Sequence, residues 1–369
     1  MGNMNKTTKI PYFFRDKPIF GLDIGPSSLK VMQVNQALSK TATGKAKFPQ
    51  VVGYGYTPFD RGAIVDGVIV QPEVIAKAAL DLFENHLIGD ITTKRAAVAI
   101  PAYRTFTRSV QLPKLKASEL AEAVQLEAEQ YISAPLSELY LDYEVIKEDA
   151  EHTELFVVAV PKTIVDSYLD FAHILGLKAI LIEPTLSSSG RLFSIDYQSD
   201  VATAIIDFGS RSADISIYDN HVLVTGTVPA GGDIFTNAIK TKLNVTPAEA
   251  QLIKTKYGLS ASKRQAEITR ALEPILSQLV KEIRRMIRYY EERYGAERPI
   301  KQIITLGGGA NMPGLSDYLT NALRLAVRHT DPWQYFNYKG LQPPSPADKP
   351  MYATVAGLSL SNPKEAFRP

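Results

Sequence analysis

Two stretches of the chain repeat one pattern of apolar and polar positions. Each has an apolar strand that ends in Asp, a turn of Gly and small polar residues, and a second apolar strand; the copies run through residues 20–34 and 203–218. Small turn residues leave backbone N–H groups open to an anion, and hydroxyl groups can donate further bonds. One copy alone is equally compatible with a plain β-hairpin. Two copies predict two similar halves, each offering a phosphate-binding loop to one ligand between them.

The other apolar runs predict a mixture of strands and helices. Further strands are expected at 50–58, 95–100, 104–112, 139–148, 153–160, 180–182, 221–227 and 300–306. Helices are expected from Pro72, from the cap residue Ser118 to about Ile132, from Pro161 to Gly176, over 186–196, from Ile234, from Thr246, over 270–294 and over 351–360. The apolar stripe of the 270–294 helix indicates core packing rather than a face for a partner.

This order of elements predicts an α/β fold of two duplicated halves with an inserted small α+β subdomain. We expect a flexible N-terminal arm at 1–17, a first half at 18–103 and 179–200, and the inserted subdomain at 104–178. We expect a second half at 201–237 and 300–369, with a helical subdomain at 238–299.

The composition narrows the classes of partner and site. A length of 369 residues suits two domains, and a net charge of +2 gives no reason to expect nucleic acid or an anionic membrane as main partner. Without Cys there are no disulfides or thiolate metal sites, and the five His show no ligand spacing. No apolar run approaches the roughly 18 residues of a membrane span, and the first residues lack the apolar core of a signal peptide. We therefore expect a cytoplasmic protein that reaches a membrane only through partners.

The two hairpins and two further segments resemble the actin-like ATPase superfamily, which includes actin, the ATPase domain of Hsp70, hexokinase and FtsA. Residues 182–187 look like its connecting segment, and residues 303–315, which contain three consecutive Gly, look like its adenosine loop. These segments follow the order of the superfamily. The resemblance implies a duplicated, ribonuclease H-like fold that binds ATP and Mg²⁺ between its halves.

Several segments are more specifically similar to the PilM family of type IV pilus assembly: residues 20–25 with Lys30, 126–132, 139–143 and 176–184. This resemblance implies an ATP-binding adaptor with weak or absent ATPase activity. It further implies capture of the N-terminal cytoplasmic peptide of PilN in a groove between the first half and the insertion. Through PilN the protein would be linked to PilO and other pilus machinery at the inner face of the cytoplasmic membrane, and self-association is compatible with this role.

Two other classes of function stay open. An FtsA-like polymerising cytoskeletal protein shares the fold, but FtsA ends in a basic amphipathic membrane helix that this sequence does not show before Pro369. A small-molecule kinase on this fold needs a general-base Asp beside a substrate pocket, and the sequence offers no clear candidate. The cytoplasmic part of the secretion protein GspL is a further relative, and it continues into a membrane span.

The resemblance assigns roles to residues of both hairpins and of two later turns. Asp23 and Asp207 are the candidates for the Mg²⁺ shell, and Asp207 at its strand end could hold the ion through water. Candidate phosphate-binding residues are Gly25, Ser27, Ser28 and Lys30 on one side, Gly209, Ser210, Arg211 and Ser212 on the other, and Gly231, Gly232 and Asp233 at a helix start, where free N–H groups and the helix dipole favour an anion. Gly308 and Gly309 are expected beside the α-phosphate or adenosine.

Four other positions bear on these roles. Gln251 and Lys254 match an acidic-x-x-Lys pair that reaches the adenosine in the superfamily; Gln departs from that pattern, and a solvated helix face explains both residues equally well. Glu183 matches the position that orients or activates water in catalytic relatives, although a nucleotide switch needs binding alone. Pro26 stiffens the first loop and removes one N–H donor from it.

Overall fold

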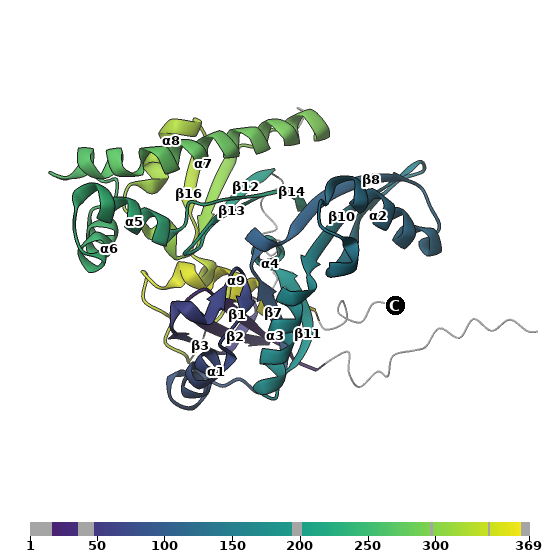
Figure 1. The fold of residues 1–369 in the computed structure, drawn as a ribbon, viewed down its shortest axis with the longest axis horizontal. Coiled ribbons are helices and arrows are strands. Elements are labelled where there is room, and N and C mark those ends of the chain that lie inside the picture. Colours follow the sequence, from purple (N-terminus) through teal and green to yellow (C-terminus); the bar gives the residue numbers. More distant parts are fainter. Residues whose placement is uncertain (1–16, 36–47, 194–200, 296–297, 339, 363–369) are drawn as a thin grey trace, which may run out of the picture.

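The computed structural model describes residues 17–35, 48–193, 201–295, 298–338 and 340–362. The predicted N-terminal arm, apart from Lys17, lies outside the described residues. Figure 1 shows two lobes that each contain a β-sheet, with the yellow helix α9 (Ala353–Ser359) between them and a smaller subdomain to one side.

The first half is built on a six-stranded sheet in the order β11-β7-β1-β2-β3-β6. Its strands are β1 (Phe20–Gly25), β2 (Ser28–Asn35), β3 (Gln50–Pro58), β6 (Ile88–Gly89), β7 (Arg95–Ile100) and β11 (Lys178–Pro184), and its covering helices are α1 (Pro72–Asp81) and α3 (Lys162–Ile174). Ile75 of α1 and Phe171 of α3 pack in one cluster with Phe20 and Leu22 of β1. The apolar stripes of both helices and the apolar strands therefore form the first core.

The second half repeats this arrangement on a five-stranded sheet in the order β14-β13-β12-β15-β16. Its strands are β12 (Thr203–Phe208), β13 (Ala213–Asp219), β14 (His221–Val228), β15 (Gln302–Leu306) and β16 (Ala326–His329), and its helices are α5 (Gly232–Leu243), α6 (Pro247–Lys256), α7 (Gln265–Tyr294) and α8 (Leu315–Leu323). β12 pairs antiparallel with β13 and parallel with β15, just as β1 pairs antiparallel with β2 and parallel with β7. The shared pairing confirms the predicted duplicated α/β fold.

Two helices, α4 (Thr185–Phe193) and α9 (Ala353–Ser359), pack on each other between the sheets. A Cβ on Gly357 would lie 1.9 Å from the carbonyl oxygen of Ser188, so Gly alone fits at this crossing. α9 packs on β1, β2 and β7, and α4 packs on β13 and β14. The expectation that all of 300–369 belongs to the second half is therefore corrected for α9, because its neighbours lie on the first sheet.

The inserted subdomain is a three-stranded sheet in the order β8-β10-β9, with α2 packed on it. Its elements are β8 (Phe106–Pro113), α2 (Ala117–Tyr131), β9 (Leu139–Glu148) and β10 (His152–Pro161). The predicted cap at Ser118 is wrong by two residues, because Lys116 is the N-cap and its backbone N–H donates to the Glu119 carboxylate (3.1 Å). The expected boundary at 178 is also too late, since Tyr168 and Phe171 of α3 are buried in the core of the first half.

Short elements complete the described chain. They are the strands β4 (Ile64–Val65) and β5 (Val68–Ile69), 3-10 turns at Arg61–Ala63, Ala102–Arg104, Leu136–Glu138, Gly308–Asn311, Pro332–Tyr335 and Lys349–Tyr352, and a π turn at Leu82–His86. The turn at Ala102–Arg104 explains why β8 begins two residues after the expected Arg104. Of the helices that the structure describes, none combines the length and apolar character that a bilayer span requires.

Helix α7 begins five residues before the predicted position 270 and contains Pro274. Pro274 is exposed, and the buried stripe continues on both sides of it through Ile268, Leu272 and Leu276. Proline removes one helical hydrogen bond, but burial of this stripe keeps the helix continuous.

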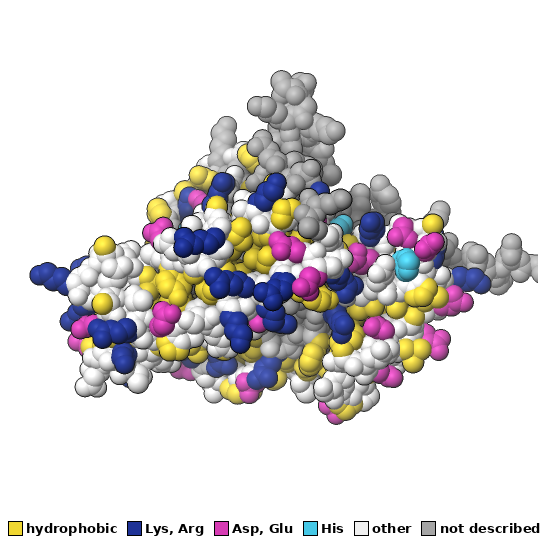
Figure 2. Space-filling model, turned by 90° about the horizontal axis from the view of Figure 1, so that it is seen from above, with side chains coloured by type: hydrophobic (Ala, Val, Ile, Leu, Met, Phe, Trp, Pro, Cys, Tyr) yellow, Lys and Arg dark blue, Asp and Glu magenta, His cyan; other side chains and the backbone are white. Residues whose placement is uncertain are grey.

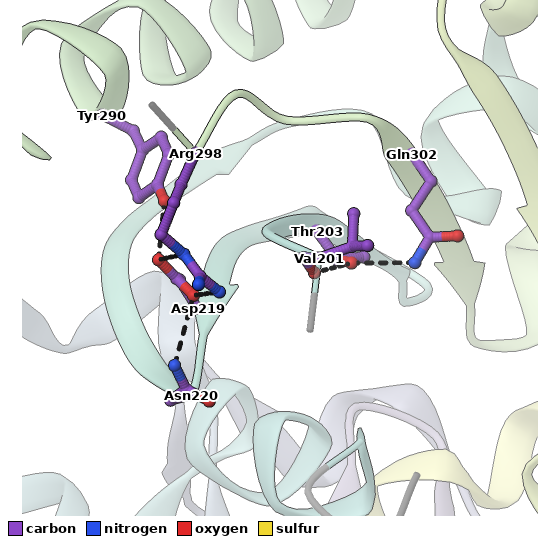
Figure 3. A network of polar contacts seen from close by, with 7 residues as sticks. All are labelled: Val201, Thr203, Asp219, Asn220, Tyr290, Arg298 and Gln302. Carbon is purple, nitrogen blue, oxygen red and sulfur yellow. Dashed lines mark hydrogen bonds and ion pairs between the residues drawn. The ribbon is translucent and has the colours of Figure 1, made fainter. Parts of the chain in front are cut away.

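The C-terminal end of α7 is tied to the β13–β14 hairpin by Asp219 (Figure 3). The Tyr290 hydroxyl donates to Asp219 Oδ2 (2.8 Å), and the Arg298 guanidinium donates to both carboxylate oxygens (3.0 and 2.6 Å). The same figure shows Gln302 donating to the Thr203 hydroxyl (3.0 Å), which links β15 to β12. Both ends of the connection from α7 to β15 are therefore anchored.

The inserted subdomain also touches the second half. The Ser109 hydroxyl donates to the carbonyl oxygen of Leu223 (2.6 Å), and the Tyr294 hydroxyl donates to the Glu154 carboxylate (2.7 Å). The inserted subdomain therefore contacts both halves, and not only the first half from which it extends.

We predict that Gly357→Ala destabilises the protein by roughly 3 kcal/mol or more, because the new methyl group meets backbone that cannot move away. Gly190→Ala on α4 is the matched control, since its Cβ would meet the side chains of Val222 and Tyr218 and no backbone atom, and a change within about 1 kcal/mol is expected. Urea unfolding measures both; equal losses would contradict the tight crossing.

Candidate functional site

A cavity of about 420 Å³ lies between the halves, and both Asp hairpins open into it. The predicted residues that line it are Asp23, Gly25, Ser27, Ser28, Lys30, Asp207, Gly209, Ser210, Arg211, Ser212, Gly232, Asp233, Gln251, Lys254, Gly308 and Gly309. Gly231 and Glu183 are not among the lining residues. The fold thus gathers residues from five separate segments at one place.

The first hairpin places an acid and a base opposite each other. Asp23 on β1 is the register partner of Lys30 on β2, and the two side chains form a buried ion pair of 3.0 Å. The Lys30 ammonium also donates to the Ser28 hydroxyl (3.3 Å). The charge of Asp23 is therefore balanced within the protein.

The second hairpin has an acid at both positions. Asp207 on β12 is the register partner of Asp214 on β13. Burial, with the nearby carboxylates of Asp214 and Asp23, raises the pKa of Asp207 to about 7. Burial likewise raises the pKa of Asp214 to about 6, against hydrogen bonds from Thr227, Ser212 and Thr185. Among the described residues, neither carboxylate of this hairpin forms an ion pair, in contrast to Asp23 in the first hairpin.

Asp214 is absent from the residues predicted from the sequence. The available signal was its place in the hairpin: an acidic residue in an apolar strand, directly across from Asp207. The same comparison with Lys30 in the first hairpin would have shown that the two loops differ in charge.

The start of α5 supports the second loop. The N–H groups of Gly232 and Asp233 donate to the carbonyl oxygens of Gly209 (2.9 Å) and Ser210 (2.8 Å). A Cβ on Gly231 would lie 2.4 Å from the Ser210 carbonyl oxygen. The expectation that this helix start offers free N–H groups is therefore corrected at Gly232 and Asp233, because the loop of 209–212 docks on it.

Lys254 reaches the cavity from α6. Its buried ammonium donates to the Gly232 carbonyl oxygen (2.8 Å) and to the Thr236 hydroxyl (2.9 Å), and the exposed Gln251 accepts a bond from the same hydroxyl (2.9 Å). Burial lowers the pKa of Lys254, while Asp233 acts in the opposite direction. Because both acceptors of this ammonium group are uncharged, a lysine at the cavity wall is suited to an anionic or hydroxyl-rich ligand.

The turn after β15 closes the cavity near Asp207. Gly307 has a φ of 78°, and a Cβ there would lie 2.3 Å from Asp207 Oδ1. The missing side chain lets this turn approach the carboxylate, and Gly308 and Gly309 follow it at the cavity wall.

Glu183 lies behind the cavity in an ion pair with Arg191. The guanidinium donates to both carboxylate oxygens (2.5 and 2.6 Å), and the Ser188 hydroxyl adds a bond of 2.8 Å. With its oxygens engaged in this way, the carboxylate joins the end of β11 to α4.

The paired sheets, the crossed helices and the cavity between the halves define an actin-like fold. One chain in a solved PilM–PilN type IV pilus biogenesis complex is similar over 96% of this chain and 99% of that chain, with a TM-score of 0.78 and 22% identity. The ethanolamine utilization protein EutJ of Carboxydothermus hydrogenoformans is similar over 94% of this chain and 91% of its own, with a TM-score of 0.51 and 14% identity. At such identities these likenesses show the fold alone.

The sequence model of the type IV pilus assembly protein PilM matches residues 21–362, and the chain therefore belongs to the PilM family. FtsA of Enterococcus faecalis is 25% identical over 384 residues, which cover 92% of this chain and 82% of that protein. FtsA of Neisseria meningitidis is 23% identical over 199 residues. That match covers 48% of this chain and 47% of that relative, so it spans about half of each.

We predict that Asp207→Asn is more stable than the wild type at pH 8, in the absence of divalent cations, by on the order of 2 kcal/mol. The pKa of Asp207 is about 7 in the folded state and 3.8 is the ordinary value of an Asp side chain, so between about pH 4 and 7 the native state holds a proton that the unfolded chain has released. Wild-type stability therefore falls as pH rises through this window, and the advantage of the variant vanishes near pH 4.

Urea unfolding followed by fluorescence of the single Trp, at pH 4 to 8, measures this difference. Asp170→Asn, on the exposed face of α3, is the matched control and should show no such pH dependence. A variant that is less stable than the wild type at pH 8 would contradict the raised pKa.

Proposed function

We propose that the chain is an ATP-binding adaptor of type IV pilus assembly, which holds Mg-ATP between its halves and binds the N-terminal cytoplasmic peptide of PilN. The observation that carries this proposal is the pair of Asp hairpins facing one cavity in a member of the PilM family. Through PilN the protein is linked to PilO and recruited to the inner face of the cytoplasmic membrane.

The carboxylates in the cavity suit a metal ion that binds together with a nucleotide. Among the described residues, Asp207 accepts long hydrogen bonds from the hydroxyls of Ser189 (3.3 Å) and Thr354 (3.4 Å), and burial with the nearby carboxylates of Asp214 and Asp23 raises its pKa. Within the described residues, no group of three His or acidic side chains forms a metal cage. Mg²⁺ at nucleotide sites is held by one or two carboxylates together with phosphate oxygens and water. Asp207 and Asp23 would supply these carboxylates.

The remaining residues would receive the nucleotide itself. Lys30 and the loops at 25–28 and 209–212 face the phosphates, and Ser210 offers a buried hydroxyl without a partner among the described residues. Lys254 and Gln251 would contact the sugar, and the Gly308–Gly309 turn lines the same cavity. Mg²⁺ would screen the phosphate charge when it is bound.

Hydrolysis is not required for this function. Glu183 is held by Arg191 outside the cavity lining, and this arrangement favours a role in fixing β11 to α4 over activation of water. Asp214 and Thr185 reach the cavity wall nearby, so weak hydrolysis would depend on them instead.

The PilN peptide is proposed to lie between the first half and the insertion. The exposed ring of Tyr140 on β9 donates through its hydroxyl to Asp166 of α3 (2.9 Å), and the exposed Leu169 lies one turn along the same helix. These side chains give an apolar surface at the junction, where an extended peptide could add backbone and side-chain contacts.

We predict that Lys254→Met weakens Mg-ATP binding at least about tenfold, because it removes a desolvated cation from the cavity wall. Lys263→Met, at an exposed position outside the cavity, is the matched control and should bind as the wild type. Asp207→Ala should abolish the Mg²⁺ dependence of binding. Calorimetry measures each affinity, and wild-type binding by Lys254→Met would place the nucleotide elsewhere.

We predict that a PilN N-terminal peptide binds with micromolar affinity and that Tyr140→Ala weakens binding about tenfold. Tyr289→Ala, on the exposed face of α7, is the matched control. Calorimetry with and without Mg-ATP, repeated with Asp207→Ala, shows whether the two sites are coupled. Peptide binding that fails while Mg-ATP still binds would reject the adaptor role and favour an FtsA-like protein.

A further inference from the structure

A basic hollow lies between α7 and α8, far from the nucleotide cavity. Its rim carries Lys281, Arg284, Arg285 and Arg288 of α7, and its apolar wall includes Val280 and Tyr318. Figure 2 shows Lys and Arg side chains gathered over the face on which α7 and α8 lie in Figure 1. Basic rims with apolar walls suit a partner that presents acidic and apolar side chains together.

Two of these cations are left for a partner. Arg285 pairs with Glu282 (2.5 Å), and Arg284 donates to the Ala322 carbonyl oxygen (2.5 Å). Lys281 and Arg288 are exposed, and neither has an ion pair or hydrogen-bond partner among the described residues. They lie seven residues apart, which is two turns or about 10 Å along one side of the helix.

Helix α2 of the inserted subdomain carries the complementary pattern. Glu122 and Glu129 are exposed, and neither has an ion-pair partner among the residues that the structure describes. They are also seven residues apart, and Leu126 lies between them on the same face with 58% of its surface exposed. An unpartnered stripe of acid, Leu and acid therefore faces away from the subdomain.

We propose that the hollow between α7 and α8 receives helix α2 of a second copy of this chain. The equal spacing lets Glu122 and Glu129 meet Lys281 and Arg288 together, while Leu126 covers the apolar wall. In Figure 1 α2 lies at the right, in the inserted subdomain, and α8 lies at the upper left, well separated from it, so the contact joins two copies.

The wider charge distribution supports this pairing. Residues 106–161 contain eleven acidic and four basic residues, whereas residues 238–299 contain thirteen basic and seven acidic ones. Opposite charge on two subdomains of a nearly neutral chain steers copies into a head-to-tail arrangement. Because the two patches differ, the contact can repeat from copy to copy into rows or closed rings, or form twice in a dimer with two-fold symmetry. This association does not depend on nucleotide or peptide binding.

Charge exchange tests the contact in sedimentation velocity runs on the full chain. We expect concentration-dependent association of the wild type at low salt, weakened at high salt by screening. Glu122→Lys with Glu129→Lys, and separately Lys281→Glu with Arg288→Glu, should each reduce self-association at least tenfold. A mixture of these two variants, and a chain that carries all four changes, should associate again.

Glu138→Lys with Glu144→Lys is the matched control, because it alters the charge of the same subdomain away from the α2 stripe. It should leave the association constant within about twofold of the wild type. A wild type that stays monomeric at low salt, or variants that fail to associate when mixed, would overturn the contact. An acidic segment of another protein would then be the better occupant of the hollow.

Discussion

The close crossing of α4 and α9 is the constraint on which the site depends. Their contact at Gly357 and Ser188 sets how near the two sheets can come. The same helices orient the acidic hairpin: Ser189 of α4 and Thr354 of α9 donate to Asp207, and Thr185 of α4 donates to Asp214. The two helices that pack the halves together therefore also fix the positions of the Asp207 and Asp214 carboxylates.

The two hairpins share a backbone and differ in charge. In the first, Lys30 neutralises Asp23; in the second, Asp214 stands where the lysine would be and leaves Asp207 with too much negative charge around it. Because of this asymmetry, the side of the cavity formed by the second hairpin is suited to a cation, and the side formed by the first hairpin offers hydrogen-bond donors. In a metal–nucleotide complex the metal would meet the carboxylates and the phosphates would meet the donors, and the geometry therefore supports the proposed ligand.

The inserted subdomain contacts both halves of the molecule. It grows from the first half, yet Ser109 and Glu154 hold it to the second half through Leu223 and Tyr294. A change in the distance between the halves has to break or shift these contacts. The subdomain that carries the proposed peptide surface and the acidic stripe of α2 is therefore mechanically joined to both walls of the cavity.

The sequence by itself determined the duplicated hairpins, the order of strands and helices, and most of the residues at the cavity, because strand alternation, turn residues and Asp position are local patterns. Only the tertiary structure decided the partners of those residues. Glu183 pairs with Arg191, and the N–H groups of Gly232 and Asp233 donate to the neighbouring loop. Helix α9 packs on the first sheet, and α3 packs in the core of the first half and not in the insertion. Each of these outcomes depends on which groups packing brings within a few ångströms, and a local pattern does not contain that information.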